Sequence, residues 1–189
     1  MSPSATPPSP SSSPSDPSGG GVVHGPSGVR FCRGCGGELE ARLVGDRMRP
    51  VCRHCGTATY FNPAVGVAVV LRDTEGRVLL GRRRGSYGGQ WCIPCGYVEW
   101  EEDVRAAAAR EFREETGLDV VVGDVVAVHS NFHNAAQHTV GIWFEGTVIG
   151  GTLEADDDLD EVAFFDPSAP PEPLAFATDV LVLRQLAQI

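Results

Sequence analysis

The chain has 189 residues, of which 42% are hydrophobic, and it carries a formal net charge of -10. This length permits one ordinary domain together with a small module. The negative charge argues against broad electrostatic binding to nucleic acid or to an anionic membrane, because both would repel the chain. Apolar runs such as residues 65–71 are too short to span a bilayer.

The N-terminal segment, residues 1–28, consists mostly of serine, proline and glycine. Such a segment buries too little apolar surface to offset its chain entropy, so we predict that it is disordered. It has neither the basic region nor the apolar region of a signal peptide, and the first arginine of the chain is Arg30, which argues against a transit peptide. We therefore expect a cytoplasmic protein.

Residues 29–61 contain two Cys-x-x-Cys-Gly pairs, Cys32 with Cys35 and Cys52 with Cys55. Closely spaced pairs in a chain without a secretion signal are typical of metal ligands rather than disulfides. Four thiolates at this spacing suit tetrahedral zinc and leave no open coordination position. We predict a small zinc ribbon in which the metal is structural.

Residues 62–189 alternate between strand and helix patterns. The continuous apolar run at 62–71 predicts a strand that is buried on both faces, and a turn leads from it to a second strand at 77–82. The clearest helix is at 103–116, where Gly117 is the expected terminator. Further strands are predicted at about 119–128, 138–149 and 161–165, and a last helix at about 175–187. Strands around one central and one terminal helix predict an α/β/α sandwich with a mixed sheet.

The helix at 103–116 carries three glutamates, Glu111, Glu114 and Glu115. Their spacing of i, i+3 and i+4 puts the three carboxylates on one face. We expect this face to lie away from the buried stripe that contains Phe112. A solvated acidic face is the usual explanation of such a run when it stands alone.

These glutamates belong to a longer pattern that begins at Gly96. It reads Gly-x5-Glu-x7-Arg-Glu-Phe-x-Glu-Glu-x-Gly-Leu, and its fixed positions are Gly96, Glu102, Arg110, Glu111, Phe112, Glu114, Glu115, Gly117 and Leu118. The pattern matches the complete signature of the Nudix hydrolases, and the sequence resembles that family closely here. The resemblance implies a metal-dependent enzyme that hydrolyses a nucleoside diphosphate linked to another group.

The physical chemistry of a carboxylate-rich helix fits this resemblance. A pyrophosphate is polyanionic, and water attacks it slowly until divalent cations neutralise its oxygens. Mg²⁺ or Mn²⁺ prefers carboxylate oxygens, and the resemblance implies Glu111, Glu114 and Glu115 as the ligands. Glu102 is expected to assist directly or through water, and Arg110 to hold a glutamate in place by a bidentate ion pair.

The general base and the phosphate contacts are open at this stage. Members of the family use either a glutamate of the box helix or one on a later loop, and Glu161 matches the later position, although an exposed acidic loop explains Glu161 equally well. Arg82, Arg83 and Arg84 precede the box, and we expect one of them to pair with substrate phosphates. Gly96 is expected to let the backbone turn around the metal site and its substrate.

A third cysteine pair, Cys92 and Cys95, lies just before Gly96. Relatives commonly read Trp-x-Leu-Pro-Gly-Gly here, so this stretch matches the strand that delivers the box glycine. An incidental substitution explains both cysteines, and redox sensitivity or a metal role are the alternatives.

A zinc ribbon that precedes a Nudix domain resembles two groups of enzymes. One group cleaves NADH and the NAD caps of RNA, but its Ser-Gln-Pro-rich signature after the box is missing here. The other group hydrolyses ADP-ribose or FAD, and its C-terminal tail looks similar to residues 173–183. The resemblance therefore implies release of AMP from an adenine compound, and the alternatives are an NADH or NAD-cap pyrophosphatase and a non-catalytic module that senses nucleotides.

The expected partner is a small nucleotide, and we expect neither a membrane nor a nucleic acid partner except a capped RNA end. A homodimer stays open, since dimers are frequent in the family. Three aromatic residues are candidates for stacking on adenine: Phe132, Tyr87 and Trp143. Each of them fits a place in the core at least as well.

Overall fold

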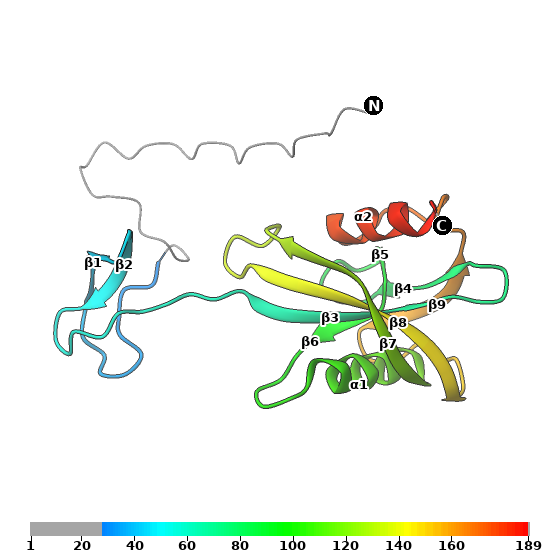
Figure 1. The fold of residues 1–189 in the computed structure, drawn as a ribbon, viewed down its shortest axis with the longest axis horizontal. Helices are drawn as coiled ribbons and strands as arrows, with labels where there is room; N and C mark the ends of the chain where they lie inside the picture. The colour runs from blue at the N-terminus through cyan, green and yellow to red at the C-terminus, as the bar shows by residue number, and fades with distance from the viewer. Residues whose placement is uncertain (1–27, 189) are drawn as a thin grey trace, which may run out of the picture. The chain divides into compact units, whose positions relative to one another are not determined.

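The structure is a computed structural model that describes residues 28–188. The predicted disorder of residues 1–28 therefore lies outside the described residues, apart from Gly28. The chain divides into two compact units, of which the first ends at Phe61 and the second begins at Asn62 (Figure 1).

The first unit is built on a β-hairpin between two cysteine-containing turns. Strands β1 (Leu39–Val44) and β2 (Arg47–Cys52) pair antiparallel. The turn between them contains Gly45 at a φ of 66°. Gly36 and Gly56 follow the two cysteine pairs with φ values of 71° and 73°, in the left-handed region that favours glycine. The glycine after each pair thus allows the chain to turn back tightly around the thiols.

The second unit contains two sheets. The four-stranded sheet has the order β6 (Cys95–Tyr97), β3 (Ala64–Leu71), β8 (Thr139–Gly151) and β7 (Leu118–Asn131). The three-stranded sheet has the order β5 (Trp91–Cys92), β4 (Val78–Arg83) and β9 (Leu159–Phe165). Strands β3 and β8 run parallel, whereas the other strand pairs of these two sheets are antiparallel. The larger sheet is therefore mixed, as predicted.

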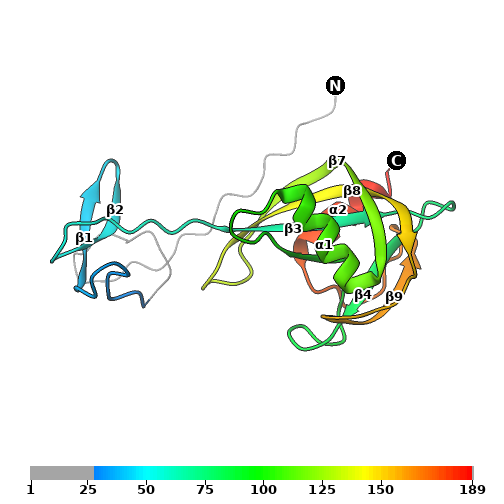
Figure 2. The same cartoon turned by 90° about the horizontal axis from the view of Figure 1, so that it is seen from below.

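Two helices cover opposite faces of this sheet, α1 (Val104–Thr116) and α2 (Ala177–Leu186) (Figures 1 and 2). Alternate residues of β3 explain the arrangement, because successive side chains of a strand point to opposite faces. Val67 and Val69 pack in the core beneath α1, and Ala68 and Val70 pack in the core beneath α2. The continuous apolar run of β3 thus reflects burial on both faces, and the α/β/α sandwich is confirmed.

Helix α1 begins and ends at well-defined caps. The side chain of Asp103 accepts hydrogen bonds from the backbone N–H groups of Arg105 and Ala106, which otherwise lack partners in the first turn. At the other end Gly117 adopts a φ of 70°, and its N–H donates to the carbonyl of Arg113. These caps hold the helix, and with it the acidic side chains, in one register against the sheet.

The strand expected to deliver Gly96 is divided in two. Its first part, β5, belongs to the three-stranded sheet, and its second part, β6, belongs to the four-stranded sheet. The chain crosses between the sheets at Ile93 and Pro94, where the proline has no N–H to donate to a ladder. The N–H of Ile93 donates to Asp179 Oδ2 at 3.0 Å. The crossing carries Gly96 from one sheet to the other, next to α1.

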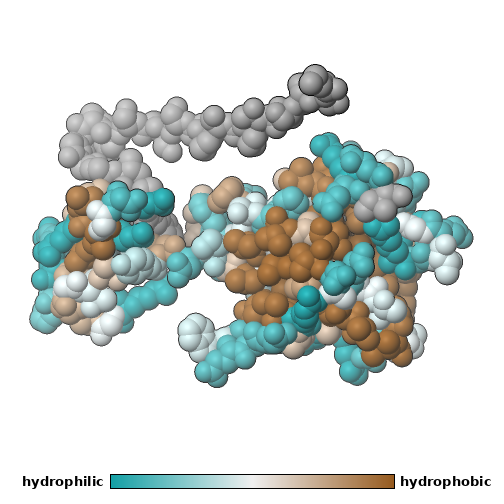
Figure 3. Space-filling model, viewed as in Figure 1, coloured by the Kyte–Doolittle hydropathy of each residue, from teal (hydrophilic) through white to brown (hydrophobic). Residues whose placement is uncertain are grey.

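Apolar side chains also reach the surface of the second unit. They gather over β7 and β8 (Figure 3), and the exposed ones include Val121, Val125, Val128 and Ile149. Contiguous apolar surface of this kind is typical of places where proteins associate. Within residues 28–188, no helix combines the length and the apolar character that crossing a membrane requires.

Candidate active site

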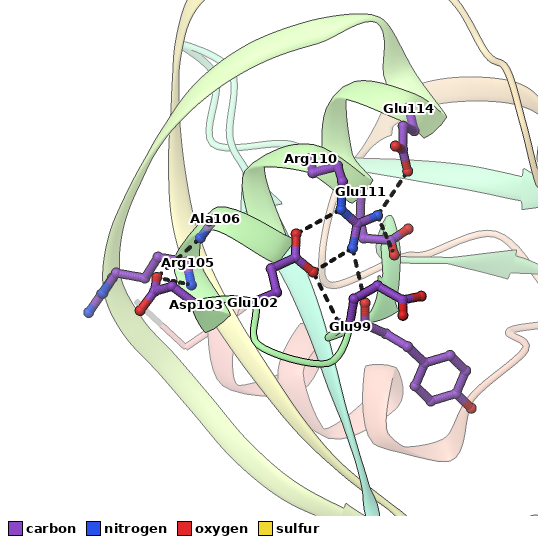
Figure 4. A network of polar contacts seen from close by, with 9 residues as sticks. Glu99, Glu102, Asp103, Arg105, Ala106, Arg110, Glu111 and Glu114 are labelled. Atoms are coloured by element: carbon purple, nitrogen blue, oxygen red, sulfur yellow. Dashed lines mark hydrogen bonds and ion pairs between the residues drawn. The ribbon is translucent and has the colours of Figure 1, made fainter.

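Arg110 lies at the centre of the acidic face of α1 (Figure 4). Its Nε and Nη2 contact the two carboxylate oxygens of Glu102, both at 2.8 Å. Its Nη1 donates to Glu111 at 2.9 Å and to Glu114 at 3.0 Å, and Nη2 also donates to the carbonyl of Tyr97 at 3.2 Å. One guanidinium therefore holds three carboxylates of the box together, and the bidentate contact is made with Glu102.

The charges of this cluster perturb one another. Hydrogen bonds from Arg110 lower the pKa of Glu102 to about 2, so Glu102 is ionised at any physiological pH. Burial raises the pKa of Glu111, and Arg110 opposes that shift. Glu114 is more open to solvent, with 47% of its side chain exposed. The accessible carboxylate of Glu114 thus lies next to the partly desolvated carboxylate of Glu111.

Glu115 lies toward the core and not away from the buried stripe of α1, which corrects the expectation for this residue. It is only 1% exposed, and its Oε2 accepts a hydrogen bond from the N–H of Cys95 at 2.8 Å. At 3.6 residues per turn Glu115 is displaced from Glu111 by about 40°, toward Phe112 and the core. Burial raises the pKa of Glu115 well above its ordinary value. A buried carboxylate is costly unless a cation or hydrogen bonds compensate it, and the N–H of Cys95 supplies one such hydrogen bond.

Gly96 makes the close approach of β6 to α1 possible. A Cβ at this position would overlap the carboxyl group of Glu111. The box therefore needs glycine at this position because any larger side chain would displace the carboxyl group of Glu111 or push β6 away from α1. The need for glycine comes from this close contact and not from a positive φ.

A cavity of about 490 Å³ opens beside these carboxylates, and both Glu111 and Glu115 line it. Pockets of this size accommodate small organic ligands. Of the three arginines before the box, Arg83 lines the cavity, and it is only 8% exposed. Its Nη2 pairs with Asp158 at 2.7 Å. Burial lowers the pKa of Arg83, but the nearby cysteines Cys92 and Cys95 and the carboxylate of Glu115 raise it by more, so the net shift is upward.

Three other residues that the sequence suggested for the site, Arg82, Arg84 and Glu161, lie outside the cavity. Arg82 pairs with Asp160 and Glu161, and Arg84 donates to the carbonyl of Leu159. Asp157 does line the cavity, and its charge contributes to the raised pKa of Glu111. The later-loop acids that line the cavity are therefore Asp157 and Asp158, and the sequence pattern singled out neither of them.

Asp179 is a second carboxylate in the cavity that sequence reasoning missed. It is 2% exposed in the first turn of α2 and accepts the N–H of Ile93. Burial raises its pKa to about 7, although the hydrogen bond from Ile93 opposes the shift. The sequence did contain a signal for the burial of Asp179, because this acid lies in the same helical stripe as the apolar residues Val182 and Leu183.

The sulfur atoms of Cys32, Cys35, Cys52 and Cys55 lie within 4.8 Å of one another. Two of the distances, Cys32 to Cys55 and Cys35 to Cys52, are 3.8 and 3.5 Å. Tetrahedral zinc with bonds of about 2.3 Å places its sulfur ligands about 3.8 Å apart. The N–H groups of His54 and Cys55 point to the sulfur of Cys52, as in a thiolate-stabilising turn. The arrangement fits structural zinc.

Among residues 28–188, no other group of three or more such side chains is equally close. The box glutamates are spread around Arg110, so their role as metal ligands stays a prediction. Cys92 and Cys95 lie outside the four-cysteine group. Cys92 is fully buried, with Arg83 Nη1 at 3.9 Å from its sulfur. The neighbouring Cys92 thiol, together with burial, raises the pKa of Cys95.

Comparison with known families agrees with the box and the ribbon. Residues 62–185 match the family described as NUDIX domain, and residues 30–60 match the family described as Nudix N-terminal. The chain belongs to the Nudix family. With the intact box, this membership makes it a Nudix hydrolase.

Individual relatives of this Nudix hydrolase differ in their named substrates. The chain is 36% identical over 124 residues to an ADP-ribose pyrophosphatase of Methanocaldococcus jannaschii, which covers 65% of this chain and 73% of that protein. It is 26% identical over 166 residues to an NAD-capped RNA hydrolase, NudC, of Vibrio atlanticus. That match covers 87% of this chain but only 58% of the relative, so the chain spans less than two thirds of it.

Among solved structures, a NUDIX hydrolase from Nitrosomonas europaea is similar with a TM-score of 0.70 and 31% identity, covering 84% of this chain and 88% of that one. The match includes most of the described residues, so the Nudix fold and its mixed sheet are shared with an experimentally known member of the family.

Changing Cys52 to Ser should abolish zinc retention, because one of four thiolate ligands is lost. Atomic emission on the purified protein should find about one zinc ion per chain before the change and close to none after it. The matched control is the double change Cys92→Ser and Cys95→Ser, which should leave the zinc content unaltered. Loss of zinc from the control alone would contradict the assignment of the site.

Changing Asp179 to Asn should make stability less dependent on pH. The folded protein holds the proton of Asp179 up to about pH 7, whereas the ordinary pKa is 3.8, so the folded state binds more protons in this window. Stability therefore falls as pH rises through the window. Each pKa unit corresponds to about 1.4 kcal/mol, and the variant should avoid a loss of a few kcal/mol.

Urea unfolding between pH 4 and pH 8 measures this effect, with Asp124→Asn, the same change on an exposed residue, as the control. Parallel stability curves for the wild type and Asp179→Asn would show that the proton of Asp179 has no such influence.

Proposed function

We propose that the protein hydrolyses the pyrophosphate bond of an adenine nucleotide, with ADP-ribose or FAD as the expected substrate, and releases AMP. The observation that carries the proposal is that two box carboxylates, Glu111 and Glu115, line a cavity of about 490 Å³. The cavity gives a nucleotide a place beside the acidic face of α1. The similarity to an ADP-ribose pyrophosphatase supports the choice of substrate.

The residues around Arg110 suit Mg²⁺ or Mn²⁺. Glu111, Glu114 and Glu115 offer the hard oxygen donors that these ions prefer, and a bound cation would offset the cost of burying the carboxylate of Glu115, which is 1% exposed. Arg110 already occupies a position where positive charge is favoured between Glu111 and Glu114. When bound, the divalent ion would neutralise phosphate oxygens and acidify the attacking water.

Protein side chains would then position the metal-binding carboxylates and the substrate phosphate. Glu102 anchors Arg110 through two hydrogen bonds, and Arg110 fixes the orientation of Glu111 and Glu114. Arg83, held by Asp158 at the cavity wall, provides a cation toward which a phosphate can be drawn. Orientation of this kind lowers the barrier because the reacting groups lose less freedom on the way to the transition state.

A box glutamate or an acid of the later loop would accept the proton of the attacking water. Glu161 was the candidate of the later loop, but its contact with Arg82 and its place outside the cavity favour Asp157 over Glu161. Asp157 lines the cavity and lies close enough to influence Glu111.

We further propose that the ribbon binds zinc, that the protein is cytoplasmic and that it forms a homodimer. Structural zinc in the ribbon is supported by the distances between its four sulfurs. No disulfide joins any of the six cysteines, all of which lie within the described residues, and this is consistent with a cytoplasmic location. The exposed valines of β7 support a homodimer through the face shown in Figure 3.

A second candidate function is hydrolysis of NADH or of NAD-capped RNA. It is favoured by the similarity to NudC, which extends over 87% of this chain and includes both of its units. The charge of -10 opposes binding along an RNA backbone, so a capped end would have to be recognised through its nucleotide alone.

One experiment separates these substrates. The protein is incubated with ADP-ribose, FAD, NADH and NAD-capped RNA in the presence of Mg²⁺ or Mn²⁺, and AMP is measured. We expect the fastest release from ADP-ribose or FAD. No nucleotide product from any substrate, with zinc retained, would favour a non-catalytic sensing module.

Changing Glu114 to Gln should reduce kcat by about 100-fold or more, since losing a metal-binding charge raises the barrier by several kcal/mol. Circular dichroism should show an intact fold, because 47% of the Glu114 side chain is exposed. The control is Glu75→Gln, an equal change of charge at a side chain that is 70% exposed and outside the cavity. A wild-type rate for Glu114→Gln would remove this residue from the metal site.

A further inference from the structure

Three aromatic rings from distant parts of the chain meet at the cavity. Tyr87 lies in the loop between β4 and β5, His133 lies in the loop between β7 and β8, and Phe176 is the N-cap residue of α2. The ring centroids are 5.7 Å apart for Tyr87 and His133, 5.4 Å for Tyr87 and Phe176, and 5.6 Å for His133 and Phe176. All three residues line the cavity that Glu111 and Glu115 also line. We call these three residues the aromatic cluster.

The backbone of Tyr87 supports a binding role for the cluster. Its φ is 62°, in the left-handed region where a bulky residue is rare. Glycines surround it in the sequence Gly85-Ser86-Tyr87-Gly88-Gly89, and a glycine would adopt this conformation without strain. Strained residues of this kind concentrate at ligand sites. The loop therefore keeps an aromatic ring at a position where the backbone alone favours glycine.

The surroundings indicate which part of a ligand the cluster binds. Glu111 and Glu115, which line the same cavity, attract cations and, through them, phosphate. The aromatic cluster offers apolar ring faces, and 39% of Tyr87 is exposed. The guanidinium of Arg83 lies 5.5 Å from the ring centre of Phe176, between the cluster and Asp158. Flat, uncharged heterocycles stack on such rings, whereas a phosphate gains nothing from them.

The other two aromatic candidates do not share this position. Phe132 is 66% exposed, contacts His138 and does not line the cavity. Trp143 reaches the cavity, but it is 5% exposed and packs in the core beneath α2. The indole of Trp143 is therefore largely covered. Tyr97 also lines the cavity and is 53% exposed, but it lies on β6 beside Arg110, which donates to its carbonyl, and its ring is not part of the cluster.

We propose that Tyr87, His133 and Phe176 form the subsite for the nucleobase of the substrate, with the base stacked on the cluster and the pyrophosphate beside the box glutamates. The inference rests on the proposed function only for the identity of the base, which is adenine if the substrate is ADP-ribose. The cluster then places the nucleotide half of the substrate in the cavity and leaves the second half to extend away from it.

Binding of AMP and of ribose 5-phosphate tests the subsite, because these compounds differ by the base. Calorimetry with Mg²⁺ should show AMP binding to the wild type at least about 10-fold more tightly than ribose 5-phosphate. Changing Tyr87 to Gly should weaken AMP binding about 10-fold, the effect of losing one base–aromatic stack, and should leave ribose 5-phosphate binding unchanged. Glycine suits the φ of 62°, so the loop should fold at least as well in this variant.

Two further variants sharpen the result. Tyr87→Phe keeps the ring without the hydroxyl and should bind AMP as the wild type does. Phe132→Ala removes an exposed aromatic ring outside the cavity and should change neither affinity. The proposal is overturned if Tyr87→Gly binds AMP, GMP, CMP and UMP each as tightly as the wild type does, or if none of them binds more tightly than ribose 5-phosphate.

The failure of the proposed function has a different signature. If the wild type hydrolyses ADP-ribose but Tyr87→Gly has an unchanged KM, the subsite is wrong and the function stands. If GMP, CMP or UMP, but not AMP, loses affinity in Tyr87→Gly, the subsite stands and the adenine substrate is wrong. If none of the four nucleotides binds more tightly than ribose 5-phosphate, the subsite is wrong whatever the enzyme hydrolyses.

Discussion

The crowding of negative charge on α1 is the constraint on which the rest of the site depends. Carboxylates three and four residues apart on one helix repel one another, and Arg110 relieves this repulsion by contacting Glu102, Glu111 and Glu114 together. To reach Glu102, the guanidinium spans from the helix to the loop before it. The same contacts therefore tie the helix to the segment that carries Gly96, and the acidic side chains are held in place before any substrate arrives.

The packing of the sandwich determines how differently the three helix glutamates behave. Glu114 stays in solvent, Glu111 lies against β6 where Gly96 leaves room for its carboxyl group, and Glu115 is buried beneath the strand. Three residues of one type within one turn and a half thus have three environments. The deepest of them accepts a backbone hydrogen bond from Cys95, so the strand that crosses between the two sheets also orients the acid.

The remainder of the cavity comes from segments that are far apart in the chain. Arg83 ends β4, Asp157 and Asp158 precede β9, and Asp179 lies in the first turn of α2, near the C-terminus. Their proximity follows from the antiparallel pairing of β4 with β9 and from the crossing at Ile93, which joins the N–H of that residue to Asp179. Neighbours of this kind are set by tertiary contacts, so no local spacing could have indicated them.

The sequence by itself determined the features that depend on short-range spacing. The ribbon cysteines, the capped helix, the box carboxylates and the doubly buried strand β3 follow from residues within a few positions of one another, and the signature of the box indicated the family. Only the tertiary structure decided which arginine and which later acid face the cavity, that Glu115 is buried, and that Tyr87 meets His133 and Phe176. The physical reason is that exposure and the direction of a side chain depend on what packs against it, and those partners come from other elements of the fold. Glu115 meets Cys95, 20 residues away, and the three rings of the cluster lie more than 40 residues apart in the chain.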